Sequence, residues 1–191
     1  MPRAPDACRR LEVHIAHCMF QEVASLFRAS GLLYTDVKLE NALLRRGCGQ
    51  GGGARVMMAD YGSLFPLGAA PCLFTYVSPA NVYLFQERTV QRTQATWGHV
   101  AFGLGVSLGV LLSAPFVDTL RDGDRHLDRL LENQVEAFVG AQNPALAALL
   151  RSLLQFNVTF RLTQGERCRA TSADDVGAAF GAYFDECRAQ E

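Results

Sequence analysis

Three side chains of different chemistry stand close together in the first third of this 191-residue chain. Asp36, Lys38 and Asn41 place a carboxylate, an ammonium and an amide on one short segment. Asp60 supplies a second carboxylate farther along the chain, in the turn-like run Asp-Tyr-Gly. Amide and carboxylate oxygens that face one another form a hard, oxygen-rich site suited to Mg²⁺. These four residues are therefore the first candidates for a functional site.

A strand hairpin is expected to bring the two parts of this set together. The apolar segment 42–44 reads as a strand, the glycine-rich segment 48–54 as its connection, and residues 55–59 as the return strand. The outer ends of two hairpin strands lie side by side. We therefore expect Asn41 and Asp60 to be neighbours, although they are far apart in the sequence.

Helices are expected over most of the remaining chain. Residues 11–29 repeat apolar side chains at three- and four-residue steps, which predicts an amphipathic helix that ends at Gly31. Further helices are expected at 96–112, 124–139, 144–156 and 172–188, while 63–90 is predicted to be mostly a long ordered loop. The predicted fold class is α+β and mostly α, with a short β-hairpin beside the loop that carries Asp36.

These motifs resemble the catalytic core of eukaryotic-type protein kinases. The run Tyr34 to Asn41 (Y-T-D-V-K-L-E-N) is similar to the H-R-D-x-K-x-x-N catalytic loop, and Asp60-Tyr61-Gly62 is similar to D-F-G. The resemblance implies that Asp36 accepts the proton of the substrate hydroxyl and that Lys38 balances charge on the transferred phosphoryl group. It also implies ATP and Mg²⁺ as cofactors, with the metal held by Asn41 and Asp60.

The same resemblance places Leu43 beneath the adenine ring and extends over roughly residues 12–165. Its other landmarks are a helix leading into the loop at 26–33, a Y-x-A-P-like run at 76–79, a buried W-x-x-G-like helix at 102–105, and a late leucine, arginine and threonine signature at 153–163. It implies one partial domain over 1–191, the large lobe of a protein kinase.

Two departures from the kinase pattern concern activity. Lys38 is the only lysine of the chain, and no G-x-G-x-x-G run precedes a strand. We therefore expect the small lobe to be absent, and this chain alone to bind ATP weakly and to transfer phosphate poorly. Thr35 replaces the usual arginine of the loop, so control by a phosphorylated activation segment is not expected.

Composition excludes several other classes of partner. The 18 Lys and Arg against 19 Asp and Glu give a net charge of -1, which offers no broad basic surface for nucleic acid. The uncharged run 100–117 is interpreted as a helix buried on all sides, so no membrane span is expected. The 6 cysteines form no C-x-x-C pair and no apolar leader opens the chain, which favours a reducing, cytoplasmic or intracellular location.

The function implied by the resemblance is serine/threonine phosphorylation of a protein substrate. The Y-T-D and D-Y-G-S runs also look like those of divergent kinases from large DNA viruses, which would act in the host cell. Two alternatives stay open. The chain is a pseudokinase or truncated kinase that binds a partner protein, with a small lobe supplied in trans, or it is a phosphotransferase for small molecules.

Overall fold

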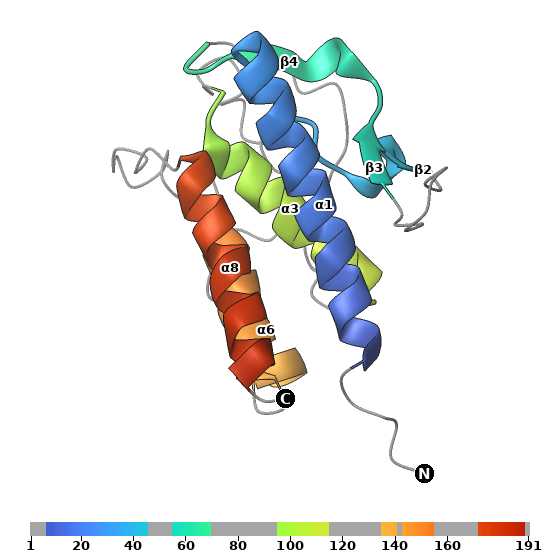
Figure 1. Cartoon of the computed structure of the whole chain (residues 1–191), viewed down its shortest axis with the longest axis vertical. Helices are drawn as coiled ribbons and strands as arrows, with labels where there is room; N and C mark the ends of the chain where they lie inside the picture. The colour runs from blue at the N-terminus through green and yellow to red at the C-terminus, as the bar shows by residue number, and fades with distance from the viewer. Residues whose placement is uncertain are drawn as a thin grey trace.

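The structure is a computed structural model, and it describes residues 7–45, 55–69, 95–114, 135–140, 143–154 and 172–189 (Figure 1). In chain order the elements are α1 (Ala7–Ser30), β1 (Leu32–Tyr34), η1 (Leu39–Asn41), β2 (Ala42–Arg45), β3 (Arg55–Met58), η2 (Tyr61–Ser63), β4 (Leu64–Pro66), α3 (Trp97–Leu111), η4 (Glu136–Gly140), α6 (Pro144–Leu154) and α8 (Ala173–Ala189). The fold is mostly helical with two small sheets, as the predicted α+β class requires.

The first helix forms because its apolar residues recur on one face. Val13, Met19 and Val23 are completely buried along α1, whereas the opposite face is exposed. The helix ends at Gly31, whose φ of 71° lies in the left-handed region and whose N–H donates to the carbonyl of Phe27 at 2.8 Å. This end confirms the prediction and turns the chain directly into β1.

The helix α3 is the centre of the molecule. Every residue from Trp97 to Gly109 is buried, and α3 contacts α1, α6 and α8. Burial on all sides explains why this stretch carries no charged residue. Among the residues that the structure describes, no helix is long and apolar enough to cross a membrane.

Glycines let the neighbours of α3 approach its backbone closely. A Cβ on Gly103 would lie 2.6 Å from the carbonyl oxygen of Val37, and a Cβ on Gly105 would lie 2.9 Å from the side chain of Leu154. Both distances are too short for a real side chain. The segment that carries Asp36 and Lys38 therefore rests directly on the backbone of the central helix.

Two antiparallel strand pairs flank this segment. In one pair β2 and β3 align Ala42 with Met58 and Arg45 with Arg55, which confirms the predicted hairpin. In the other pair β1 aligns with β4. β4 was not expected, because 63–90 was predicted to be mostly loop; it is only three residues long and pairs with a strand far away in the sequence.

The last helix packs along the first and against α6, as Figure 1 shows for the red α8 and the blue α1. Its start is capped, because the N–H of Ser172 donates to the carboxylate of Asp175 at 2.8 Å and the N–H of Asp175 donates to the hydroxyl of Ser172 at 3.2 Å. Between the two helices the ring of His17 lies 5.1 Å from that of Phe180 and 5.2 Å from that of Phe184.

Several predicted features lie outside the described residues. They are most of the helix expected at 124–139, the Y-x-A-P-like run at 76–79 and the arginine and threonine of the 153–163 signature. Within the described part, the helices expected at 96–112, 144–156 and 172–188 correspond to α3, α6 and α8.

Candidate active site

The candidate site contains a buried ion pair between Lys38 and Asp36. The Nζ of Lys38 donates to Oδ2 of Asp36 at 2.7 Å, and the two side chains are only 11% and 1% exposed. The chain turns between them without a helix, so the two residues approach across a single intervening position. The single lysine of the sequence therefore forms an ion pair with a buried carboxylate.

Asn41 closes the same loop from the other side. Its Nδ2 donates to the backbone carbonyl of Asp36 and to Oδ2 of Asp36, each at 3.1 Å. The short turn Leu39–Asn41 sets this reach, since the N–H of Asn41 donates to the carbonyl of Lys38 at 3.2 Å. Two donors thus converge on one carboxylate oxygen, and they fix the orientation of the Asp36 side chain.

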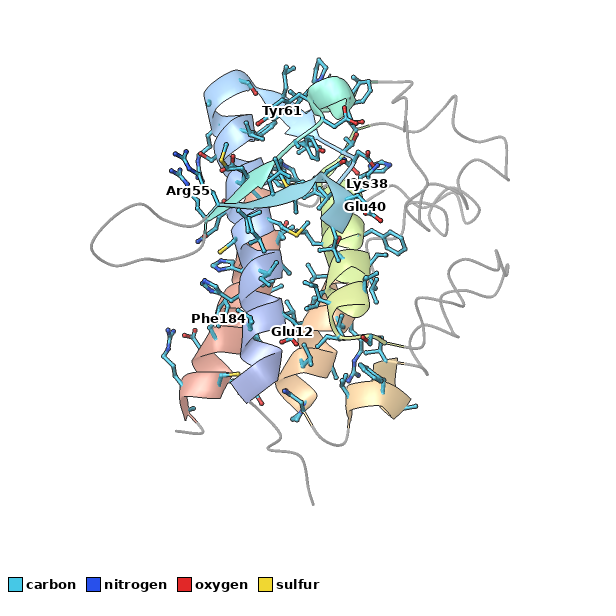
Figure 2. The ribbon with its side chains drawn as sticks, turned by 90° about the vertical axis from the view of Figure 1, so that its right-hand side faces the viewer. Glu12, Lys38, Glu40, Arg55, Tyr61 and Phe184 are labelled. Carbon is cyan, nitrogen blue, oxygen red and sulfur yellow. The ribbon has the colours of Figure 1, made fainter. Side chains whose placement is uncertain are left out.

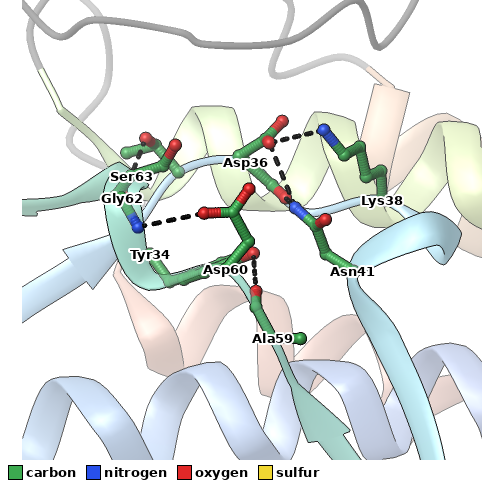
Figure 3. A network of polar contacts seen from close by, with 9 residues as sticks. Tyr34, Asp36, Lys38, Asn41, Ala59, Asp60, Gly62 and Ser63 are labelled. Carbon is green, nitrogen blue, oxygen red and sulfur yellow. Dashed lines mark hydrogen bonds and ion pairs between the residues drawn. The ribbon is translucent and has the colours of Figure 1, made fainter.

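One residue, Ala59, joins this loop to Asp60 (Figure 3). The N–H of Ala59 donates to the backbone carbonyl of Asn41 at 2.7 Å, and the hydroxyl of Tyr34 donates to the carbonyl of Ala59 at 2.7 Å. Ala59 is held from both sides, and Asp60 follows it directly. The expectation that Asn41 and Asp60 are neighbours therefore agrees with the geometry.

The backbone of Asp60 adopts an uncommon conformation. Its φ is 56°, in the left-handed region that aspartate and asparagine tolerate better than most residues. Its Oδ1 accepts a hydrogen bond from the N–H of Gly62 at 3.4 Å, which caps the turn Tyr61–Ser63. The residue is exposed, and it forms no ion pair with any cation in the part of the chain that the structure describes.

Tyr34 is the residue that sequence analysis did not single out for a role. It is fully buried, and burial together with the nearby charges of Asp36 and Asp60 raises the pKa of its hydroxyl far above the usual range. The hydroxyl therefore stays protonated and remains a donor to Ala59. The signal available in the sequence was a tyrosine two residues before Asp36, in an otherwise apolar strand.

Thr35 connects the segment before Asp36 to the turn after Asp60. Its N–H and its hydroxyl both donate to the backbone carbonyl of Ser63, at 3.0 Å and 3.2 Å. Both residues are buried. The two bonds tie the end of β1 to the turn that follows Asp60, so a neutral side chain holds the two motifs together.

Leu43 lies on the exposed side of the hairpin. Its side chain is 56% exposed, and its cross-strand partner Met57 is 36% exposed. Residues opposite one another in an antiparallel pair share a face. Leu43 thus lies two residues beyond Asn41 on an exposed apolar surface.

The oxygen donors of the site are compatible with a magnesium ion. The amide of Asn41 and the carboxylate of Asp60 supply the oxygen ligands that Mg²⁺ prefers, and this ion commonly takes only one or two protein ligands besides phosphate and water. Among the described residues there is no group of three or more His, Cys, Asp and Glu side chains that could hold a metal by itself. Asn41 and Asp60 thus offer two oxygen ligands, a number that Mg²⁺ commonly takes from a protein.

Comparison with known proteins adds no relative: no family model, no curated protein and no solved structure matches this chain.

Proposed function

We propose that this chain binds ATP with Mg²⁺ and transfers the γ-phosphoryl group to a serine or threonine hydroxyl of a protein substrate. The observation that carries the proposal is the link through Ala59, which holds the Asp36–Asn41 loop and Asp60 at one place. A base, an ammonium and two oxygen ligands are the groups that phosphoryl transfer requires.

Each side chain then has one task. The carboxylate of Asp36 takes the proton of the attacking serine or threonine hydroxyl. The oxygen of that hydroxyl bonds to the γ-phosphorus while the bond from the γ-phosphorus to the bridging oxygen of the β-phosphate breaks, which leaves ADP. Lys38 lies beside Asp36, so its ammonium is available to the negative oxygens of the group being transferred. Mg²⁺, when bound by Asn41 and Asp60, neutralises charge on the phosphate oxygens.

The apolar hairpin surface supplies the remaining contact. Leu43 and Met57 offer an exposed platform two residues along the strands from Asn41 and Ala59. An adenine ring on this platform would direct its phosphates toward Asn41 and Asp60. The sequence holds no second lysine for the α- and β-phosphates, so we expect millimolar affinity for ATP and slow turnover.

The test is an ATP titration with Mg²⁺, followed by a phosphorylation assay with labelled ATP. The acceptors are a mixed serine and threonine peptide and an aminoglycoside, which separates a protein kinase from a small-molecule kinase. Asp36→Asn should keep nucleotide affinity and lower turnover by about a hundredfold or more. No binding by the parent chain, or equal turnover by Asp36→Asn, would contradict the proposal.

A further inference from the structure

We propose that the outer face of the β2–β3 hairpin binds an acidic, partly apolar segment of a partner protein. This hairpin face consists of Leu43, Arg45, Arg55 and Met57, which form two cross-strand pairs on the same side of the two strands. The inference goes beyond phosphoryl transfer, because it concerns a protein contact that forms without nucleotide.

The first observation is a local excess of exposed apolar surface. Seven large apolar side chains are strongly exposed among the described residues: Leu11, Leu43, Leu44, Met57, Tyr61, Leu67 and Val110. Two of the seven, Leu43 and Met57, are a cross-strand pair on this face. Exposed apolar side chains that gather on one element indicate an interaction surface, whereas single ones are ordinary.

The second observation is a pair of like charges at the end of the same face. Arg45 and Arg55 are direct cross-strand partners, and both are exposed. Opposed residues have Cβ atoms about 5 Å apart, and like charges at this distance destabilise the strand pair. Neither arginine forms an ion pair with a carboxylate of the described residues.

This charge pattern identifies the partner. A carboxylate placed between Arg45 and Arg55 would accept hydrogen bonds from both guanidinium groups and would remove their repulsion. A partner with positive or neutral side chains would leave the repulsion in place. Charge complementarity therefore selects an acidic segment.

The spacing of the two pairs defines the shape of that segment. Leu43 and Arg45 are two residues apart on one strand, so the apolar pair and the cationic pair are separated by about 7 Å. An extended partner strand repeats its side chains on one face at the same interval. The fitting segment thus carries an apolar residue and an aspartate or glutamate two positions apart.

The cationic end of the face is remote from the catalytic loop. Figure 2 shows Arg55 at one end of the hairpin and Lys38 and Glu40 toward the other end. A partner anchored on the two arginines would reach over Leu43 and Met57, which is where the proposed adenine platform lies. Partner binding and nucleotide binding would then influence one another.

The test uses a short fluorescein-labelled peptide of alternating leucine and glutamate, with anisotropy recorded in the absence of nucleotide. The parent chain should bind it, and the double variant Arg45→Glu, Arg55→Glu should bind about tenfold or more weakly. The double variant should instead gain affinity for the corresponding leucine and lysine peptide. Arg28→Glu, at an exposed position on α1, is the matched control and should bind like the parent chain.

A second pair of variants guards against misfolding of the first. Leu43→Ser with Met57→Ser keeps both arginines and should also weaken peptide binding. The inference is overturned if the parent chain does not bind the peptide, or if both double variants bind it as tightly as the parent chain does. Sedimentation that shows self-association, abolished by the charge reversal, would instead make a second copy of this chain the occupant and overturn the inference. Binding of an oligothymidine with the same dependence on Arg45 and Arg55 would also overturn it. A parent chain that binds ATP but does not bind the peptide would refute this inference and leave the proposed function standing.

Discussion

At the scale of single residues, the site is organised around one oxygen atom. Oδ2 of Asp36 accepts from Nζ of Lys38 and from Nδ2 of Asn41, so the charge of the buried carboxylate is shared between an ammonium and an amide. A buried charge without a partner is costly. The three residues therefore stabilise the loop, and under the proposed function the same contacts orient Asp36 as the base.

Removing the ammonium should expose this dependence. Lys38→Met removes the ammonium from beside the buried Asp36 carboxylate, and we expect a loss of about 3 kcal/mol in the free energy of unfolding. Lys38→Met combined with Asp36→Asn should lose less than the sum of the two single variants. Urea unfolding of the four proteins measures this coupling. Strict additivity would mean that the ion pair contributes nothing.

The hydroxyl of Tyr34 should matter for both folding and nucleotide binding. Tyr34→Phe leaves the carbonyl of Ala59 without its donor, which should cost about 1–2 kcal/mol and weaken binding of ATP with Mg²⁺. Tyr61→Phe, at the exposed neighbouring tyrosine, should do neither. Thermal unfolding and an ATP titration of both variants check this, and identical behaviour of the two would contradict it.

The same hydroxyl predicts a pH dependence. Burial raises the pKa of Tyr34 in the folded state, so above about pH 10 the unfolded chain releases this proton while the folded chain keeps it. The stability linked to Tyr34 is thus fully present below pH 10 and is lost as pH rises. Urea midpoints should fall more steeply above pH 10 in the parent chain than in Tyr34→Phe. Equal slopes would refute this assignment.

At the scale of elements, the sequence predicted those helices and strands whose formation depends on neighbouring residues in the chain. The period of apolar residues predicted α1, and Gly31 predicted its end, because each of these signals acts within a few residues. β4 could not be predicted, since three residues ending in Pro66 carry no period and pair only through tertiary contact. The hairpin indicated that Asn41 and Asp60 are close, but the bonds of Tyr34 and Thr35 depend on how β1 meets the segment after β3.

The helix α3 contacts the loop that carries Asp36 and Lys38 through Gly103. Gly103→Ala would place a methyl group against the carbonyl of Val37, so either the loop or the helix must shift. We expect a loss of about 1–3 kcal/mol in stability, together with weaker ATP binding. Gly181→Ala in α8 has open space around it and should be neutral or slightly stabilising. Chemical unfolding of the two variants tests this, and equal stability would show that the loop does not rest on α3.

At the scale of the whole molecule, stability depends on the buried central helix. His99, near the start of α3, is buried, and its Nδ1 accepts from the N–H of Thr96 at 3.3 Å. Burial lowers the pKa of His99 to about 4. Because His99 lies in the central helix, protonation of its imidazole ring is linked to the folding of the core.

Acidification should therefore destabilise the protein through His99. Between about pH 6.5 and 4 the unfolded chain binds a proton that the folded chain excludes, so stability falls as pH falls, by up to about 3 kcal/mol. His99→Gln should flatten this dependence, while His14→Gln, at an exposed position of α1, should leave it unchanged. Urea midpoints measured across this pH range decide the matter, and parallel curves for the parent chain and His99→Gln would be the contrary result.

The most direct measurement is calorimetric titration of ATP into the parent chain and into Asp60→Asn, each with and without Mg²⁺. Asparagine suits the left-handed backbone at position 60 and can still accept the N–H of Gly62, so the variant should fold like the parent chain. We expect the parent chain to bind ATP more tightly when Mg²⁺ is present, and Asp60→Asn to lose most of this gain. The same Mg²⁺-dependent affinity in both proteins would show that Asp60 does not hold the metal.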